Sequence, residues 1–443
     1  MSSNDSNASP AAVCSAAHIT PASGPRHRWK VLAAGVVANA AFSVAFSGIP
    51  MTAVLMRSGY QLDTATLGLV LGLMGLGIAL SELPWGLLTD RWGDRPVLLT
   101  GLAGTAVALT AMALWAAPHG GQVPALSGLA VGLLLVGLLG GSVNGASGRA
   151  VMTWFAEGER GLAMSIRQTA VPLGGGIGAL LLPALVLHGG FGAVYAVLAG
   201  LCALGAVLVM AWVHEAPPSS TGDAAPIAPS ATHIMRHGGP LYDARVWRIV
   251  AGIGILCAPQ FAVLSFGTVF LHDFGRAGQA AITTAMVTLQ VGAMGMRIWS
   301  GRWTDRRRNR SAYLRACALL SVLLFMSLGM LAFSGDPVAG TPTGRAGLVV
   351  LLALTGTCVS AWHGVAYTEL ASLAGAARAG TALGMANTSV FVICFVTPLS
   401  IPHLITLQGW PLVWFVAAAC ALVALPLLAP SGPQAEKRQS VQR

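Results

Sequence analysis

The sequence GLLTDR at residues 86–91 follows one apolar run, and GRWTDR at residues 301–306 follows another. Both copies have the pattern Gly-x-x-Thr-Asp-Arg, and the second begins half a chain after the first. A charged motif at the same place after two apolar runs indicates an internal duplication. Two related apolar halves in turn predict a membrane protein built from repeated bundles.

The composition also indicates a membrane protein. Hydrophobic residues make up 55% of the 443 residues and charged residues 9%, against roughly 25% charged in ordinary globular domains. Apolar runs long enough to cross a bilayer recur along the chain. We predict an all-α integral membrane fold with twelve transmembrane helices, at roughly 31–56, 64–88, 97–117, 124–147, 161–187, 191–213, 246–271, 279–300, 312–333, 346–368, 379–402 and 410–429.

The net charge of +10 is explained by topology and does not require a nucleic-acid partner. If the N-terminus is cytoplasmic and each run crosses once, only Arg57, Arg276 and Arg345 of the 25 Lys and Arg residues fall outside. This is the positive-inside pattern, and it predicts that both termini are cytoplasmic. The seven cysteines include no Cys-x-x-Cys pair, so neither a disulfide framework nor a metal site is predicted.

A polar connection separates six runs from six. Residues 214–244 are rich in Pro, Ser, Thr and Gly, which is typical of a flexible linker. We predict one six-helix bundle at 29–213 and a second at 245–430. Residues 1–28 are expected to form a disordered cytoplasmic tail without a signal peptide, and residues 431–443 a second cytoplasmic tail.

Further matches between the halves extend the duplication. The matched pairs, all separated by nearly the same distance along the chain, are Trp29 with Trp247, Asn144 with His363, Gln168 with Asn387, and Pro183 with Pro402. One such match has little weight, but four in the same order at a nearly constant offset indicate a repeat.

The first motif continues as WGDR at residues 92–95. The whole stretch resembles the Gly-x-x-x-Asp-Arg-x-Gly-x-Arg signature of the major facilitator superfamily, and the second copy lies where that family repeats it, without the later Gly. The resemblance covers nearly the whole chain and implies two bundles around a central path that opens alternately to each side. It implies that Gly86 lets helices approach closely and that Asp90 makes a contact that holds one access state. The motif residues with this expected gating role are Gly86, Asp90, Arg91, Gly93, Arg95, Gly301, Asp305 and Arg306.

The fifth run contains a glycine-rich stretch. Proline permits a bend and closely spaced glycines let backbones pack, so the expected hinge and packing residues are Pro172, Gly174, Gly175 and Gly176. The stretch partly resembles the fifth-helix signature of drug/proton antiporters, with Val171 in place of its first Gly. The Arg that such antiporters carry in the fourth helix is replaced here by Gly141. A flexible packing helix is therefore an alternative to exporter chemistry.

Arg297 lies inside the eighth apolar run. An intramembrane arginine is costly unless it is paired or faces water, so it marks a candidate functional site. The pattern Arg-x-x-x-Gly-x-x-x-Asp resembles the eighth helix of the monocarboxylate, oxalate/formate and nitrate branches of the superfamily. That resemblance implies that Arg297 binds the substrate anion, for which a planar guanidinium is suited. The alternative is that Arg297 snorkels or pairs with the motif.

Glu82 lies at the equivalent place in the second run, and a carboxylate there argues against nitrate. It is a candidate to neutralise Arg297 in the empty site, to carry a coupled proton, or to pair with a cytoplasmic arginine. His363 is the second proton-coupling candidate; it is alternatively a substrate ligand or a partner of a neighbouring carbonyl. The remaining substrate-binding candidates, each of which alternatively bonds only between helices or anchors a helix end, are Asn39, Arg167, Gln168, Gln260, Gln290 and Asn387.

These features predict a monomeric secondary active transporter of the cell inner membrane. It is expected to move a small, carboxylate-like organic anion with a proton by alternating access. The alternative is an efflux carrier for drugs or metabolites that works by proton antiport, and a membrane sensor would require a signalling domain. Because neither a phosphate-binding loop nor a catalytic constellation stands out in the sequence, we predict no enzyme activity, cofactor or bound metal.

Overall fold

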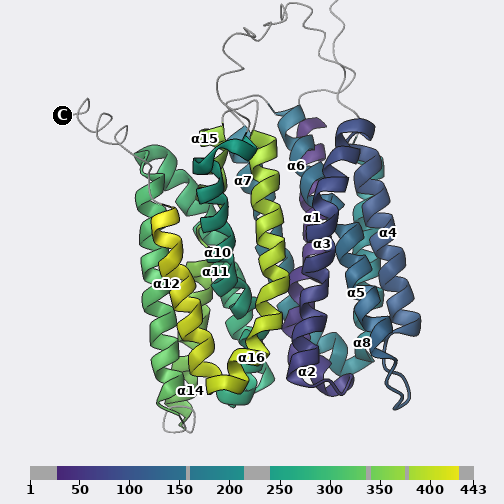
Figure 1. The fold of residues 1–443 in the computed structure, drawn as a ribbon. Coiled ribbons are helices and arrows are strands. Elements are labelled where there is room, and N and C mark those ends of the chain that lie inside the picture. Colours follow the sequence, from purple (N-terminus) through teal and green to yellow (C-terminus); the bar gives the residue numbers. More distant parts are fainter. Residues whose placement is uncertain (1–26, 156–159, 214–239, 336–340, 375–378, 429–443) are drawn as a thin grey trace, which may run out of the picture.

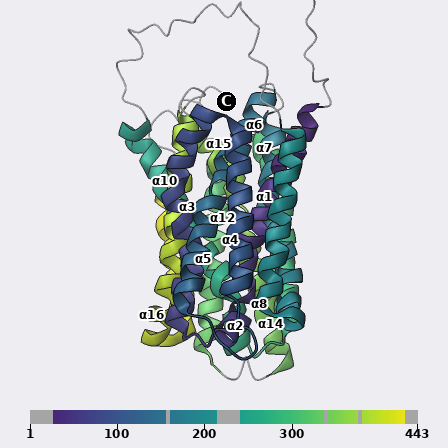
Figure 2. The ribbon, with the colours of Figure 1, turned by 90° about the vertical axis from the view of Figure 1, so that its right-hand side faces the viewer.

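The computed structural model describes residues 27–155, 160–213, 240–335, 341–374 and 379–428. These residues form a bundle of long helices that run side by side (Figures 1 and 2). The isolated bridge between His119 and Gln122 is the sole extended pairing within the described residues. The predicted tails and most of the predicted linker lie outside them.

In the first half, the opening span is assembled from three helical pieces in line. The elements are α1 (His27–Gly48), η1 (Ile49–Thr52), α2 (Ala53–Gly59), α3 (Thr64–Trp92), α4 (Asp94–Trp115), α5 (Leu126–Gly140), α6 (Ser142–Trp154), α7 (Arg160–Gln168) and α8 (Ala170–Trp212). α3 begins with a cap, because the Asp63 side chain accepts a hydrogen bond from the Thr66 amide at 2.7 Å.

The second half repeats this order. Its elements are η2 (Pro240–Tyr242), α10 (Ala244–Val269), η3 (Phe270–Phe274), α11 (Gln279–Arg307), α12 (Arg310–Phe333), α14 (Pro342–Val359), α15 (His363–Ala374) and α16 (Ala379–Leu427). η3 is a π-helical turn that continues α10.

Two of the long helices are hairpins of two spans each. α8 reverses at Gly190, whose φ is 69° and ψ is −173°, and α16 reverses at Gly409, whose φ is 72° and ψ is −163°. These values lie in a region that only glycine adopts without strain. The two glycines have the same separation along the chain as Asn144 and His363, so the duplication extends to the backbone geometry of the turns.

Nine helices in the described part of the chain are long and apolar enough to cross a membrane. α8 and α16 are among the nine and hold two spans each. α11 is not among the nine, because its arginines and Asp305 lower its hydropathy. With α11 included, the helices account for the twelve predicted spans and confirm the all-α integral membrane fold.

The fourth and tenth spans are each broken once, at equivalent positions. α5 ends at Gly140 and α6 starts at Ser142, while α14 ends at Val359 and α15 starts at His363. Gly141 and Ser360, at the two breaks, are again separated by the offset of the repeat. Discontinuous helices bring backbone carbonyls to the membrane interior, where they serve as ligands for charged groups.

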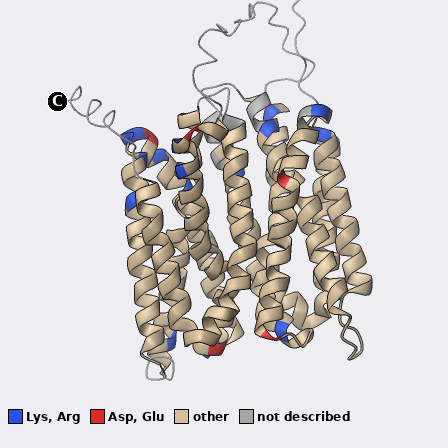
Figure 3. Cartoon of the chain, viewed as in Figure 1, with Lys and Arg blue, Asp and Glu red and all other residues tan. Residues whose placement is uncertain are grey.

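The bundle has two distinct ends. We call the end where α8 stops and η2 starts the linker end, and the end where α2 stops and α3 starts the far end. Most Lys and Arg residues of the described part of the chain lie at the linker end, at the top of Figure 3. The halves meet where α3 packs on α16 and where α8 packs on α11.

Candidate functional site

Arg297 projects from α11 into the contact between the two halves. Its side chain is 7% exposed. Nε donates to the Ser360 carbonyl at 3.4 Å, at the break in the tenth span, and Nη1 donates to the Gln168 carbonyl of α7 at 3.1 Å. Arg297 of the second half therefore touches the first half through a backbone oxygen. Within the described residues it has no carboxylate partner.

A second buried arginine lies beside it in the first half. Arg167 occupies the last turn of α7, where its Nε donates to the Ser147 hydroxyl at 2.9 Å and Nη2 donates to the Asn144 carbonyl of α6. A Cβ at Gly148 would stand 3.6 Å from Cζ of Arg167, so this glycine leaves room for the guanidinium. Residues of the fourth span thus accept hydrogen bonds from Arg167, as Ser360 of the tenth span does from Arg297.

A hydrogen-bonded chain crosses from one half to the other next to these arginines. Asn387 of α16 donates through Nδ2 to Oε1 of Glu82 on α3 at 3.0 Å. The Tyr367 hydroxyl of α15 donates to Oδ1 of Asn387 at 2.9 Å. The second carboxylate oxygen of Glu82 is buried and has no hydrogen-bond partner within the described residues. Glu82 is therefore held by a neutral amide of the opposite half.

The charge that faces Glu82 belongs to Arg167. The expectation that Glu82 neutralises Arg297 in the empty site does not describe this structure, because Arg297 bonds instead to the carbonyls of Gln168 and Ser360. The physical reason is packing: α3 of the first half meets α16, whereas α11 meets α8. Equivalent positions in a duplicated chain lie on equivalent helices, which need not touch.

His363 packs against the aromatic ring of its neighbour. Its imidazole stacks on Trp362 at 3.8 Å between ring centroids and lies 6.1 Å from the ring of Tyr367. Its Nδ1 is buried without a hydrogen-bond partner within the described residues, and the charge of Arg297 acts on the ring. His363 thus borders the arginine site from α15.

The other polar candidates are buried side chains or contact the opposite half. Asn39 of α1 and Gln260 of α10 are buried, and the side-chain oxygen of each has no partner within the described residues. Gln290 of α11 packs against the glycine-rich stretch of α8, where a Cβ at Gly175 would stand 2.2 Å from its side-chain nitrogen. Gln168 contributes its backbone carbonyl to Arg297.

The glycine-rich stretch serves close helix packing in this structure. A Cβ at Gly174 would stand 2.7 Å from the Ala40 carbonyl oxygen of α1, and a Cβ at Gly178 would stand 2.5 Å from Cα of Gly48. Pro172 is buried, whereas Gly176 is partly exposed and would carry a Cβ 3.5 Å from Gln290. The same stretch therefore joins α8 to α1 within its half and to α11 across the halves.

The far-end part of the contact is closed. A Cβ at Gly68 of α3 would stand 2.2 Å from the Pro398 carbonyl oxygen of α16, and one at Gly72 would stand 2.9 Å from the Phe395 carbonyl oxygen. At the same end, Nη1 and Nη2 of Arg57 on α2 donate to both carboxylate oxygens of Asp273 on η3, at 2.5 and 2.6 Å. The halves are in backbone contact here and are joined by a bidentate ion pair.

Four glycines near the linker end have no close neighbour among the described residues. A Cβ added at Gly86 of α3, Gly145 of α6, Gly364 of α15 or Gly384 of α16 would meet no atom of the described residues within 4 Å. No described atom approaches Gly86 closely, and the expected close helix contact at this glycine stays a prediction. Close approach on α3 occurs nearer the far end, at Gly68 and Gly72, because α16 crosses α3 there.

The first motif copy forms a turn between α3 and α4. Gly93 ends α3 and caps α4 with φ 90° and ψ 173°, a conformation that a side chain would strain. Arg95 donates to the Met210 carbonyl at 2.8 Å. Arg149 of α6 donates to the Thr89 carbonyl and lies 3.7 Å from the Asp94 carboxylate. The Arg91 side chain is exposed, and that of Asp90 lies outside the described side chains.

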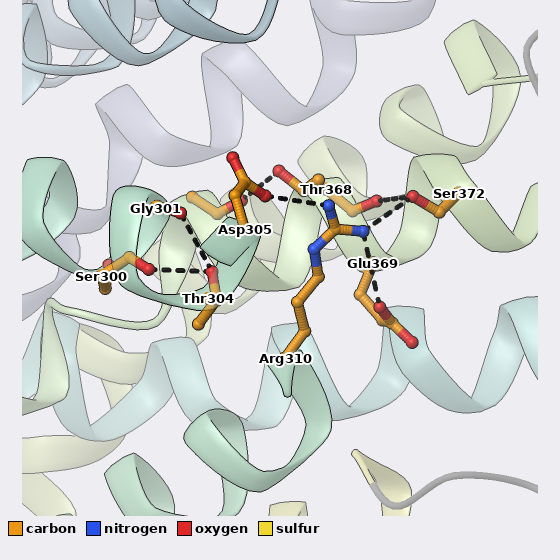
Figure 4. Close-up of polar contacts among 9 residues, drawn as sticks. Ser300, Gly301, Thr304, Asp305, Arg310, Thr368, Glu369 and Ser372 are labelled. Atoms are coloured by element: carbon orange, nitrogen blue, oxygen red, sulfur yellow. Dashed lines mark hydrogen bonds and ion pairs between the residues drawn. The ribbon is translucent and has the colours of Figure 1, made fainter. Parts of the chain in front are cut away.

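The second copy forms a network within its own half, as Figure 4 shows. Nη2 of Arg310 on α12 donates to Asp305 of α11 at 3.0 Å, and Nη1 donates to the Ser372 hydroxyl of α15 at 3.1 Å. Glu369 of α15 lies 4.0 Å from the same guanidinium. Gly301 supplies a carbonyl to Thr304, and Arg306 is exposed. Among the described residues the second motif joins α11, α12 and α15, all of the second half.

Sequence reasoning missed four residues that take part in these contacts. Tyr367 lies one helical turn after His363, a spacing that places both on one face of a helix. Ser147 lies one residue before Gly148 in a run of small residues, which gives no polar signal of its own. The pair Arg57 and Asp273 was detectable in part, because both are charged residues at equivalent ends of repeated spans.

The fold and this central polar site define a multi-pass membrane transporter, a class of protein that performs no enzymatic reaction. A family model described as Major Facilitator Superfamily matches residues 32–398. The chain therefore belongs to the major facilitator superfamily.

Relatives agree with this assignment. An uncharacterized MFS-type transporter of Mycobacterium tuberculosis strain H37Rv is 30% identical over 427 residues, which cover 94% of this chain and 89% of the relative. The probable sulfoacetate transporter SauU of Cupriavidus necator is 27% identical over 385 residues, covering 82% and 83% of the two chains. The crystal structure of a D-xylose-proton symporter matches with a TM-score of 0.72 at 14% identity, covering 91% of this chain and 98% of the symporter. That match shows the shared fold.

Proposed function

We propose that this chain is a secondary active transporter of the cell inner membrane that moves a small organic anion together with a proton. The observation that carries the proposal is Arg297, a buried guanidinium between the two halves with no carboxylate partner within the described residues. An unpaired charge in the membrane interior is costly, and a bound anion would compensate it. A planar guanidinium binds carboxylate and related oxyanions through parallel hydrogen bonds.

The relatives give limited support for an anionic substrate. SauU is named as a probable sulfoacetate transporter, and sulfoacetate carries acidic groups. At 27% identity this similarity supports the class of substrate and does not supply its identity.

Glu82 is the proton-coupling group in this proposal. It lies next to Arg167, bonds across the halves to Asn387, and keeps one buried carboxylate oxygen without a partner within the described residues. A proton on Glu82 would change the charge of the site and the bond between the halves together. A proton on His363 would instead place a second positive charge beside Arg297, which electrostatic repulsion opposes.

Transport would proceed by alternating access between a first bundle at 29–213 and a second at 245–430. The close contacts at Gly68 and Gly72 fit a state that is closed at the far end. The basic residues gathered at the linker end favour the cytoplasm as the side on which that end lies.

A thermal-shift screen of the purified protein tests the proposal. A ligand that binds the folded state raises the apparent melting temperature, so small carboxylates should stabilise the wild type and fail to stabilise Arg297→Gln. Arg245→Gln, a change to an exposed arginine at the linker end, is the matched control and should respond as the wild type does. Stabilisation of both Arg297→Gln and wild type by lipophilic cations, with no response to carboxylates, would instead favour the efflux alternative.

A further inference from the structure

Two buried guanidinium groups, one from each half, lie around the same phenol. The charges of Arg167 on α7 and Arg297 on α11 both act on Tyr367 of α15. Neither arginine forms an ion pair within the described residues. Each uses two N–H groups on protein acceptors. A guanidinium has five N–H donors, so both retain donors for the oxygens of a ligand.

Arg297 of α11 contacts α7 at the residue that follows Arg167. The carbonyl that accepts from Nη1 of Arg297 belongs to Gln168, the residue that follows Arg167. Arg297 of the second half therefore contacts the first half one residue along α7 from Arg167. A ligand placed between them would contact both halves of the transporter at once.

Glu82, the carboxylate that faces this site, forms no ion pair with either arginine within the described residues. The titratable and charged groups facing Glu82 are Arg167 of α7 and Tyr367 of α15, and the neutral amide of Asn387 faces it from α16. One oxygen of Glu82 is bonded to that amide, and the other is buried without a donor in the described part of the chain. A buried oxygen without a donor is far costlier on an ionised carboxylate than on a neutral carboxylic acid.

We propose that the substrate carries two acidic groups, one for each of Arg167 and Arg297, and that it binds with a proton on Glu82. This inference rests on the anion site proposed above and names its substrate class: a compact dianion such as a dicarboxylate or a sulfocarboxylate. With Glu82 protonated, the two negative charges of such a ligand balance the two guanidiniums. A monoanion would leave one guanidinium uncompensated in that state.

Binding of acids matched in chain length to the purified, full-length protein tests the proposal. Succinate is compared with butyrate, and sulfoacetate with propionate, by titration calorimetry at several pH values. We expect each diacid to bind about tenfold or more tightly than its monoacid partner, because a charge-assisted hydrogen bond contributes about 1.5–3 kcal/mol. Affinities for a series of dicarboxylates from malonate to adipate are then compared. The length of the diacid that binds most tightly indicates the distance between the two guanidiniums.

Single substitutions test the roles of Arg167 and Glu82 separately. Arg167→Gln should lower diacid affinity about tenfold or more and leave monoacid binding much closer to that of the wild type. Diacid binding to the wild type should take up a proton and weaken as pH rises, and Glu82→Gln should remove this pH dependence. Arg245→Gln is again the control and should keep the wild-type ratio. If Arg167→Gln does not fold, the diacid preference of the wild type and the pH response of Glu82→Gln decide the question.

The possible failures are distinguishable. Equal affinity for monoacids and diacids, with both lost in Arg297→Gln, would leave the anion site standing and refute the two-acid inference. Diacid preference with unchanged pH dependence in Glu82→Gln would refute the role of Glu82. If no acid binds and Arg297→Gln has no effect, the proposed function and this inference both fall.

Discussion

Arg57 and Asp273 form a bidentate ion pair that joins the two halves of the transporter at the far end of the bundle. The two residues are 216 positions apart, and both N–O distances are at or below 2.6 Å. Asp273 also pairs with the His272 ring at 2.7 Å. The duplication places the ends of the first and seventh spans together, and the pair closes the site on the side opposite the linker.

Breaking this pair should favour opening at the far end. Asp273→Asn removes a charge-assisted, partly buried contact of about 1–3 kcal/mol, which corresponds to about a 5- to 150-fold change in the ratio of closed to open states. The measurement is the rate at which a cysteine introduced at Ser47, which is buried, reacts with a membrane-impermeant maleimide from the far side. The charge swap Arg57→Asp with Asp273→Arg should restore slow labelling. Equal labelling rates in wild type, single variants and swap would contradict a gating role.

Gly68 should be intolerant of any side chain in the far-closed state. A Cβ there would stand 2.2 Å from the backbone oxygen of Pro398, and a backbone atom cannot rotate away as a side chain can. We expect Gly68→Ala to lower the melting temperature and to speed far-side labelling. Gly384→Ala on α16 is the control, since its Cβ meets nothing within 4 Å and alanine favours helix by roughly 1 kcal/mol over glycine. Equal melting temperatures for the two variants would show that α3 and α16 do not approach this closely.

The stability of the protein should depend on glycine at position 93 of the first motif copy and not on the arginine at the equivalent position 308 of the second. Gly93 has φ 90° and ψ 173°, so Gly93→Ala should destabilise the protein by roughly 1–3 kcal/mol. Arg308, which occupies the equivalent place in the second copy, has φ 50° and ψ 34°. Because a left-handed conformation costs a side-chain-bearing residue roughly 1–2 kcal/mol, Arg308→Gly should be stabilising or neutral. Thermal unfolding in detergent measures both. A loss of stability in Arg308→Gly would indicate that its charge contributes more than its backbone costs.

The cap of α3 should be sensitive to pH. The hydrogen bond from the Thr66 amide holds the pKa of Asp63 below its usual value. A lowered folded-state pKa means that the cap stabilises the protein above about pH 4 and that this contribution is lost as pH falls further. At neutral pH Asp63→Ala should melt below the wild type, and the gap should close on acidification. Asp63→Ser should keep a cap without this pH dependence; a gap that persists at low pH would contradict the assignment.

Proton coupling should depend on Glu82 and not on His363. Glu82→Gln keeps a hydrogen-bonding side chain but cannot bind or release a proton, so transport by this variant should lose its response to a pH gradient. His363→Asn should retain that response, even if its overall rate falls. Uptake into proteoliposomes with and without a pH gradient measures both. A full pH response in Glu82→Gln would exclude this residue as the coupling group.

Local sequence determined much of the fold. Apolar runs of bilayer length predict the helices, and the repeated motif predicts the duplication. The turns at Gly190 and Gly409 were not predicted as equivalent features, because a glycine within an apolar run is compatible with both a continuous helix and a turn. Arg297 and Glu82 are visible as charges in apolar runs, which is a signal that depends on sequence alone.

Only the tertiary structure decided which of these groups meet. Glu82 and Arg297 are equivalent in the duplication, yet Glu82 bonds to Asn387, 305 positions away, and Arg297 bonds to the Gln168 carbonyl, 129 positions away. Arg57 likewise pairs with Asp273 only because the far ends of the first and seventh spans lie side by side. The sequence by itself determined that the chain spans the membrane in two repeated halves, since the bilayer imposes helix length and hydropathy on each segment locally. The partners of the buried charges depend on which helix faces pack together, and that is settled by the shapes of residues distant in the chain.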